Sequence, residues 1–262
     1  MKPLIKYLQS SRTIRRLHLT SIDPCRHALD SIYDTITAAI RAGTDGFLLG
    51  GSTGVDRGLI DSHSRAIHQA LVDAAGNGPR LPLILFPSSA QTGVTELADG
   101  VLFLSLLNTR EVRYLIREQA KAAPFLPMLG LEPLGCGMIY IEPGGTGGRV
   151  GQADLIKPDD IPTALGYAMA AAAFGFPLIY LNAGSGSDRP VPAAMIQVVS
   201  QALETPLIVG GGITDAEKAA DAAQSGADII VTGSAVESRS DVYSAINAIA
   251  AAIHAVAPAR SQ

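Results

Sequence analysis

The sequence predicts an α/β fold, a (β/α)8 TIM barrel in which the third helix is absent or reduced. Eight short apolar runs alternate with helical patterns, which is typical of a parallel sheet with crossover helices. The chain has 262 residues, close to the roughly 250 that are typical of such a barrel. No linker or change in composition marks a boundary, so we expect residues 1–262 to form a single domain.

The strands and helices are predicted from the period of the apolar residues. The predicted strands are Leu17–Ile22, Gly46–Leu49, Leu83–Phe86, Val101–Leu104, Met138–Ile141, Leu178–Leu181, Leu207–Val209 and Ile229–Val231. The predicted helices are Arg26–Ala42, Leu59–Ala75, Arg110–Ala122, Pro158–Phe174, Ala193–Leu203, Asp215–Ser225 and Asp241–Val256. A capping box formed by Thr214 and Glu217 is expected to start the helix before the last strand, and Gly226 to end it.

One link is too short for a crossover helix. Only fourteen residues separate Phe86 from Val101, and a full crossover with its helix and two connecting loops would be cramped in that length. We therefore expect the third helix to be absent or reduced to a turn. Its absence would open a groove along the outside of the second to fourth strands, suited to a long apolar ligand.

Composition and charge exclude several classes of protein. Hydrophobic residues make up 47% of the chain and charged residues 17%, which is inconsistent with disorder. The net charge of −4 and the lack of a basic stripe argue against a nucleic-acid partner. The two cysteines, Cys25 and Cys136, suggest neither a disulfide framework nor a zinc site.

The expected location is the cytoplasm. The N-terminus is too polar for a signal peptide, and the apolar block around 168–176 is too short to span a bilayer. Any membrane contact should therefore be peripheral. We also expect a homo-oligomer, a dimer or a larger assembly.

The last two predicted strands both end in glycines. Leu207–Val209 is followed by Gly210–Gly212, and Ile229–Val231 by Thr232–Ser234. Parallel strands joined by a right-handed crossover end on the same edge of a sheet, so the two turns should be neighbours. Glycine turns let the backbone approach a ligand, and free N–H groups at helix N-termini bind anions. Because the loops after strands seven and eight of a barrel are a frequent phosphate site, the sequence predicts one here.

Polar side chains after the first two strands predict a metal or polar-substrate site. Asp23 follows the first strand, and a carboxylate at this rim is costly to bury unless it serves a ligand. Ser52 lies in the glycine-rich turn after the second strand. Mg2+ binds through one or two protein groups and keeps water and substrate phosphate as its other ligands. We therefore expect Mg2+ at Asp23 and Ser52, and we expect His18 to be a hydrogen-bonded core residue.

The sixth strand adds groups for a small phosphorylated molecule. The two-residue period of a strand puts Tyr180 and Asn182 on one face, where they should reach the hydroxyls of such a ligand. The expected phosphate contacts are Gly186, Gly211, Gly212, Gly233 and Ser234. The glycine-rich stretch from Glu142 to Arg149 is expected to be a lid or a loop that closes on the ligand.

Eight motifs between Leu17 and Glu237 resemble those of the geranylgeranylglyceryl phosphate synthase family, which includes bacterial heptaprenylglyceryl phosphate synthases. The motifs, in chain order, are HLTSIDP, FLLGGSTGV, LILFPSS, LFLSLLNTR, IEPGGTGG, YLNAGSG, PLIVGGGI and ADIIVTGSAVE. The resemblance implies a TIM-barrel prenyltransferase that uses Mg2+. It would transfer the polyprenyl group of a polyprenyl diphosphate to the 3-hydroxyl of sn-glycerol-1-phosphate and release diphosphate.

The resemblance also implies roles for individual residues. Asp23 and Ser52 would bind the metal, and Asp23, Tyr180 and Asn182 would be catalytic. The implied contacts to glycerol phosphate are Tyr180, Leu181, Asn182, Ala183, Gly184, Ser185, Gly186, Gly211, Gly212, Gly233 and Ser234. The family lacks a regular third helix and lays its prenyl chain in the groove beside it.

The sequence departs from the family pattern at three places. Asn182 stands where the family has a Glu that is proposed to help deprotonate the acceptor, and an amide cannot act as that base. Cys25 and Arg26 replace the last two residues of an IDPDK motif, and Arg149 stands where an aromatic residue is familiar. Either prenyl transfer here proceeds by ionisation with little need of a base, or the acceptor differs.

Three other functions stay open on the sequence alone. The scaffold could prenylate another phosphorylated acceptor such as 3-phosphoglycerate, or it could be a non-catalytic barrel that binds a phosphometabolite. An isomerase or aldolase could use the same phosphate site, although no lysine at a strand end is placed to form a Schiff base. Release of diphosphate would separate the prenyltransferases from a binding module.

Overall fold

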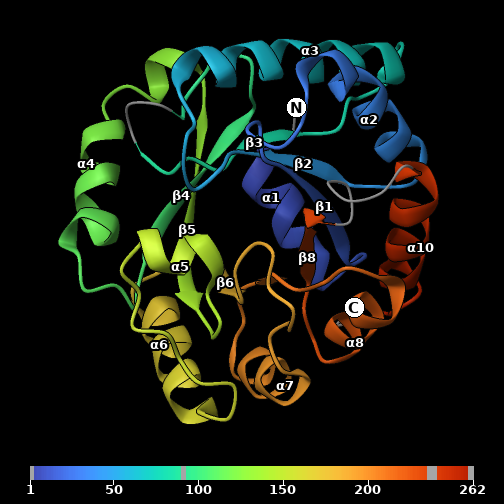
Figure 1. Cartoon of the computed structure of the whole chain (residues 1–262). Helices are drawn as coiled ribbons and strands as arrows, with labels where there is room; N and C mark the ends of the chain where they lie inside the picture. Colours follow the sequence, from blue (N-terminus) through green and yellow to red (C-terminus); the bar gives the residue numbers. More distant parts are fainter. Residues whose placement is uncertain (1–2, 90–92, 235–240, 259–262) are drawn as a thin grey trace.

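Eight parallel strands close into a barrel, as the sequence predicts (Figure 1). The structure is a computed structural model and describes residues 3–89, 93–234 and 241–258. The strands are β1 (Leu17–Ile22), β2 (Gly46–Leu49), β3 (Leu83–Leu85), β4 (Gly100–Leu106), β5 (Glu132–Tyr140), β6 (Leu178–Asn182), β7 (Leu207–Gly210) and β8 (Ile229–Thr232). Each strand pairs with the next along the chain, and β8 pairs with β1.

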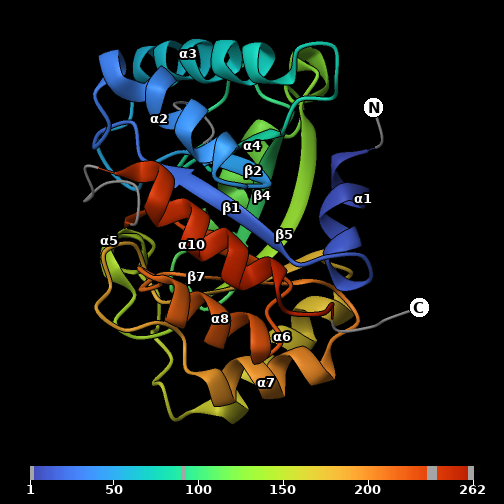
Figure 2. The same ribbon diagram turned by 90° about the vertical axis from the view of Figure 1, so that its right-hand side faces the viewer.

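Helices surround the barrel, and Figure 2 shows several of them one below another on the side that faces the viewer. The α-helices are α1 (Leu4–Gln9), α2 (Leu29–Arg41), α3 (Arg57–Ala75), α4 (Glu118–Ala122), α5 (Gly145–Val150), α6 (Ile161–Ala173), α7 (Ala193–Ala202), α8 (Ala216–Gln224) and α10 (Val242–His254). Short 3-10 or π-helical turns are η1 (Ser10–Arg12), η2 (Arg113–Arg117) and η3 (Pro127–Leu129). None of the described helices is long and apolar enough to cross a membrane.

Two expectations about helices were wrong. The N-cap of α8 is Asp215, whose side chain accepts a hydrogen bond from the backbone N–H of Lys218, so Thr214 and Glu217 do not form the expected capping box. The helix expected at Arg110–Ala122 is divided into the π-helix η2 and the short α4. Gly226 follows α8 with φ +112°, a conformation that suits glycine and ends the helix there.

The missing third helix leaves one edge of β4 unpaired. The described residues between β3 and β4 contain no helix, which confirms the expectation for this part of the chain. β4 pairs with β5 from Gly100 to Leu106, but with β3 only at Gly100 and Val101. Beyond Val101 the side chain of Gln119 takes the place of a neighbouring strand, because its amide donates to the carbonyl of Leu104.

Alternate residues of each strand face the barrel interior or the surrounding helices. Tyr180 packs in the interior with residues of the other strands, such as Met138 and Ile208. Leu181 and Ala183, which alternate with it, pack outward against α6 and α7. The two-residue period therefore decides which residues of β6 can face a ligand.

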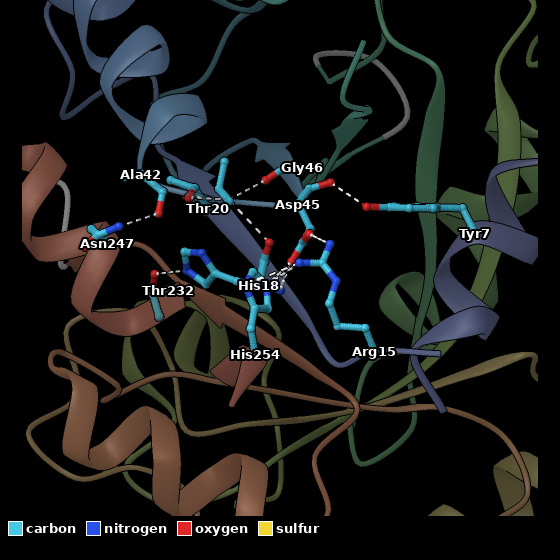
Figure 3. Close-up of polar contacts among 11 residues, drawn as sticks. Tyr7, Arg15, His18, Thr20, Ala42, Asp45, Gly46, Thr232, Asn247 and His254 are labelled. Atoms are coloured by element: carbon cyan, nitrogen blue, oxygen red, sulfur yellow. Dashed lines mark hydrogen bonds and ion pairs between the residues drawn. The ribbon is translucent and has the colours of Figure 1, made fainter. Parts of the chain in front are cut away.

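A polar cluster closes the N-terminal end of the barrel (Figure 3). The carboxylate of Asp45, just before β2, accepts hydrogen bonds from the backbone N–H of His18 at 2.8 Å and from Arg15, and its Oδ2 lies 2.7 Å from Nε2 of His254. The Tyr7 hydroxyl donates to the Asp45 carbonyl at 3.0 Å. The cluster ties α1 and α10 to the end of the barrel that usually serves stability rather than catalysis.

His18 is a buried core residue, as expected. Its side chain is fully buried, and its Nε2 lies 2.8 Å from the hydroxyl oxygen of Thr232 on β8. Burial lowers the pKa of His18 from its usual 6.5 to about 4. The imidazole is therefore neutral at physiological pH.

Candidate active site

One cavity at the C-terminal end of the barrel joins a polar region to an apolar groove. The polar region is lined by Ser21, Asp23, Gly51, Ser52, Tyr140, Tyr180, Asn182, Ser185, Gly211, Gly212, Thr232, Gly233 and Ser234. The groove is lined by Phe86, Val94, Val101, Phe103, Tyr114, Gln119, Ala122 and Leu126. The C-terminal end of a barrel is where active sites of this fold lie.

The groove passes through the opening left by the missing helix. Val101 and Phe103 belong to the outward face of β4, where they pack with the cluster between sheet and helices. Tyr114 on η2 and Ala122 on α4 form the opposite wall. The groove thus runs along the outside of β4, as the short link predicts, and it is apolar enough for a hydrocarbon chain.

Asp23 and Ser52 lie in the same part of the cavity wall. The Oδ1 atom of Asp23 accepts a hydrogen bond from the backbone N–H of Cys25 at 2.9 Å. The same oxygen packs against Gly51, where a Cβ atom would lie only 2.6 Å away. The loop after β1 and the loop after β2 are therefore in contact, and Ser52 follows directly in the second of them.

Two histidines that the sequence analysis did not single out brace the Asp23 loop. Nδ1 of His27 lies 3.0 Å from the carbonyl oxygen of Asp23, and Nε2 of His63 lies 3.0 Å from the carbonyl oxygen of His27. His63 is buried in α3. The spacing of histidines along the chain gave no signal for this contact, because it depends on how α3 packs against the loop.

The side chain of Asn182 forms a tight turn with its own loop. Its Oδ1 accepts a hydrogen bond from the backbone N–H of Gly184 at 2.7 Å. In the described part of the chain no group accepts from the amide nitrogen, and Asn182 lines the cavity. The free end of the side chain is therefore a hydrogen-bond donor.

Tyr180 and Tyr140 place two protonated hydroxyls in the cavity wall. Burial raises the pKa of Tyr180 well above its usual 10, and burial also raises the pKa of Tyr140. The hydroxyl of Tyr180 packs against Gly210, where a Cβ would come within 2.5 Å. Both phenols therefore act as hydrogen-bond donors near neutral pH, and neither is available as a base.

Tyr140 is a site residue that the sequence analysis missed. Tyr140 pairs in register with Asn182 on the neighbouring strand β6. It lies two residues after Met138, so the two-residue period of β5 could have placed both side chains on the interior face of the barrel. Asn108 fixes the end of β5 from both sides, since its side chain accepts from the N–H of Tyr140 at 3.0 Å and donates to its carbonyl at 2.9 Å.

The glycine-rich stretch after β5 is a helix, α5, rather than the expected loop. Gly144 precedes α5 with φ +73°, a conformation that favours glycine, and the helix begins at Gly145. Gly147 packs against the Tyr140 hydroxyl, which would lie 2.0 Å from a Cβ. The expectation that this stretch closes on the ligand remains a prediction, while Gly147 and Gly151 do line the cavity.

Gly211 and Gly212 are required by the packing of two loops. Their φ angles are +85° and +74°. A Cβ on Gly211 would lie 2.5 Å from the backbone nitrogen of Gly184, and one on Gly212 would lie 2.5 Å from the carbonyl of Arg189. The loop after β7 therefore fits against the loop after β6 through its glycines, whatever ligand the two loops bind.

The structure brings together most of the predicted site residues. Those that line the cavity are Asp23, Ser52, Tyr180, Asn182, Ser185, Gly211, Gly212, Gly233 and Ser234. Those that do not are Leu181, Ala183, Gly184 and Gly186. Leu181 and Ala183 pack outward. Gly184 packs against Gly144 and Gly145, which follow β5, and Gly186 is exposed. The side chains of Leu181 and Ala183 therefore cannot contact a ligand in this cavity.

Among the described residues, the polar region of the cavity wall carries one carboxylate, that of Asp23. No lysine or arginine lines the cavity within residues 3–89, 93–234 and 241–258. The same ranges hold no cluster of three or more His, Cys, Asp or Glu side chains that could bind a metal alone. A single carboxylate with a nearby hydroxyl is the kind of partial site that Mg2+ completes with water and substrate phosphate.

Comparison with known proteins assigns the chain to a family. The PcrB family matches residues 11–253, which is nearly the whole chain. The chain belongs to the PcrB family. Among curated relatives of this PcrB protein, geranylgeranylglyceryl phosphate synthase of Methanothrix thermoacetophila is 45% identical over 90% of each chain.

Two solved structures of related enzymes have the same fold. The geranylgeranylglyceryl phosphate synthase of Thermoplasma acidophilum, solved with its substrate sn-glycerol-1-phosphate, is 38% identical, with a TM-score of 0.90 over 97% of this chain and 99% of that one. The enzyme of Thermoplasma volcanium is 39% identical, with a TM-score of 0.88 over 97% of this chain and 98% of that one. The fold and the family expected from the eight motifs are confirmed.

Proposed function

We propose that this protein is a prenyltransferase that joins the polyprenyl group of a polyprenyl diphosphate to the 3-hydroxyl of sn-glycerol-1-phosphate. The observation that carries the proposal is the continuity of the cavity, in which a polar rim with glycine turns opens directly into an apolar groove. The named relatives and the related structure with bound sn-glycerol-1-phosphate support the acceptor. A phosphate-binding isomerase or aldolase would have no use for the groove.

The acceptor would bind at the polar rim. Its phosphate would lie against the backbone of Gly211, Gly212, Gly233 and Ser234, where the loops after β7 and β8 meet. Backbone N–H groups suffice for this role in barrels of this type. Tyr180 and the amide nitrogen of Asn182 would then donate hydrogen bonds to the hydroxyls of the acceptor and hold its 3-hydroxyl towards the groove.

The donor would bind with its chain in the groove and its diphosphate beside Asp23 and Ser52. Because the described cavity wall offers no basic side chain, the charge of the diphosphate needs a cation, and Mg2+ fits the donor groups present. Asp23 and Ser52 would hold the ion. When bound, Mg2+ would supply positive charge that stabilises the departing diphosphate.

The chemistry is a substitution at C1 of the donor. The bond from C1 to the diphosphate oxygen breaks, and the 3-hydroxyl oxygen of the acceptor forms a new bond to C1. Neither Tyr140 nor Tyr180 can take the hydroxyl proton near neutral pH, because burial keeps both phenols protonated. An amide at position 182 cannot take it either, so the proton passes to water or to the released diphosphate. The side chains position the acceptor.

The proposal is tested by incubating the protein with Mg2+, labelled donors from farnesyl to longer diphosphates, and a panel of three-carbon phosphates. We expect a labelled ether lipid with sn-glycerol-1-phosphate, and little product with sn-glycerol-3-phosphate or 3-phosphoglycerate. Preferential product with 3-phosphoglycerate would reassign the acceptor, and no product with any pair would reject prenyl transfer. The cytoplasmic location and the homo-oligomer stay predictions from the sequence.

A further inference from the structure

The segment that forms the outer wall of the groove carries an exposed apolar and basic surface. We define the 112–128 face by the apolar residues Val112, Leu115, Ile116, Phe125 and Met128 and the basic residues Arg113, Arg117 and Lys121. The exposed fractions of the apolar side chains range from 37% for Leu115 to 81% for Met128. Five large exposed apolar side chains within seventeen residues are a local concentration of the kind that marks interaction sites.

The inner side of the same segment lines the groove. Tyr114, Gln119, Ala122 and Leu126 alternate with the exposed residues and form part of the cavity wall. The segment is therefore one layer thick, with the groove on one side and solvent on the other. Figure 1 shows α4 at the left edge of the molecule, outside β4 and β5.

Charge on this segment is divided between its two sides. Residues 110–128 hold four basic and two acidic side chains, in a chain whose net charge is −4. The acidic Glu118 is buried on the groove side, 2.9 Å from Arg113 and 3.1 Å from Lys121. The exposed side thus presents Arg117 together with the half-exposed Arg113 and Lys121, which share the single carboxylate of Glu118, next to apolar side chains. This combination is typical of segments that lie in the interface of an anionic membrane.

We propose that the 112–128 face docks on the surface of an anionic lipid bilayer, which places the groove beside the acyl region. The inference rests on the proposed function, because a polyprenyl donor and an ether-lipid product both partition into membranes. Three basic side chains against one carboxylate leave the 112–128 face positively charged, which is complementary to an anionic bilayer. By contrast, the exposed Met169 of α6 and Phe174, which directly follows α6, lie in a stretch, residues 158–176, that has no lysine or arginine.

Vesicle binding by the full-length protein tests the docking surface. The vesicles are phosphatidylcholine alone, or phosphatidylcholine with about 30 mol % phosphatidylglycerol to give a negative surface potential. We expect binding to the anionic vesicles only, weakened at least about tenfold by Ile116→Ser/Phe125→Ser and also by Arg117→Glu. The control Met169→Ser/Phe174→Ser removes exposed apolar side chains from the other face and should bind like the wild type.

Activity separates this inference from the proposed function. Farnesyl diphosphate in solution should be used equally by the wild type and by Ile116→Ser/Phe125→Ser, whereas a long-chain donor in anionic vesicles should be used more slowly by the variant. Wild-type protein that is active on the soluble donor but does not bind anionic vesicles would overturn the docking surface alone. Vesicle binding without activity on any donor would overturn the proposed function alone. A change of oligomeric state in the variant, measured by light scattering, would assign the face to a subunit contact and overturn the inference.

Discussion

The side-chain oxygen of Asn182 accepts a hydrogen bond from the backbone N–H of Gly184, with 2.7 Å between the two atoms. This contact fixes the orientation of the amide, so that the nitrogen is the end left for a ligand. We therefore predict that Asn182 orients the acceptor hydroxyl by donating to it, since an amide cannot act as a base.

Asn182→Glu should speed prenylation of sn-glycerol-1-phosphate, because a carboxylate at this position can take the proton of the hydroxyl. A general base is worth about 10²–10⁴-fold, so we expect kcat to rise at least about tenfold. The matched control is Asn182→Gln, which introduces a side chain as long as that of Glu but without its charge. Equal rates for the Glu and Gln variants, measured from initial velocities at saturating substrates, would show that proton removal does not limit the reaction.

Asp23→Asn should lower kcat/KM for the donor by about 10²-fold or more, because one carboxylate that holds the cation is lost. The fold should be unchanged, since Asp23 lies at the C-terminal rim and its loop is also held by His27 and His63. Initial rates against Mg2+ concentration measure the effect, with circular dichroism as the folding control. A variant with the wild-type Mg2+ dependence would remove Asp23 from the site.

Gly147→Ala should impair activity through the Tyr140 hydroxyl, which lies where the new Cβ would be. Gly147 has a helical conformation in α5, so alanine is compatible with the backbone. Removing the hydroxyl should relieve the clash, and we expect Gly147→Ala/Tyr140→Phe to recover part of the lost kcat/KM relative to Gly147→Ala. A double variant whose loss equals the product of the two single losses would contradict this contact.

Stability should fall as the pH drops from 6.5 towards 4, and His18 should account for part of the loss. The folded-state pKa is about 4, whereas the unfolded-state pKa is 6.5, so the unfolded state binds a proton that the folded state does not. The contribution is about 3 kcal/mol at most, from 1.36 kcal/mol per pKa unit. The free energy of unfolding in urea at pH 7.5 and pH 5 measures it. His18→Gln, which keeps a polar contact to Thr232, should lose less stability over this interval than the wild type, and equal losses would exclude His18.

The barrel could be predicted from the sequence because its strands are continuous apolar runs. Leu17–Ile22 and Gly46–Leu49 have the predicted bounds. β5 begins at Glu132, six residues before its predicted start, because Pro133 and two glycines hide the strand pattern. α1 was missed because it has only six residues, and α5 because glycine is a poor helix former.

The candidate site was predictable where the strand period applied. The two-residue period predicts that Tyr180 and Asn182 share one face, and both line the cavity. Leu181 lies between them in the family motif, but its side chain packs outward. The close approach of Gly211 to Gly184 was not predictable, because it depends on how two loops pack. The sequence predicts a glycine turn after β7. Only the structure shows that the contact between the two backbones is enough to require a glycine at position 211.

Release of diphosphate tests the central claim most directly. Protein, Mg2+, geranylgeranyl diphosphate and sn-glycerol-1-phosphate are incubated together, and diphosphate and ether lipid are measured in the same samples. The account predicts equal amounts of the two products, and neither product when the acceptor is omitted or the metal is chelated. Tight binding of sn-glycerol-1-phosphate without release of diphosphate would contradict the account and indicate a barrel that only binds phosphometabolites.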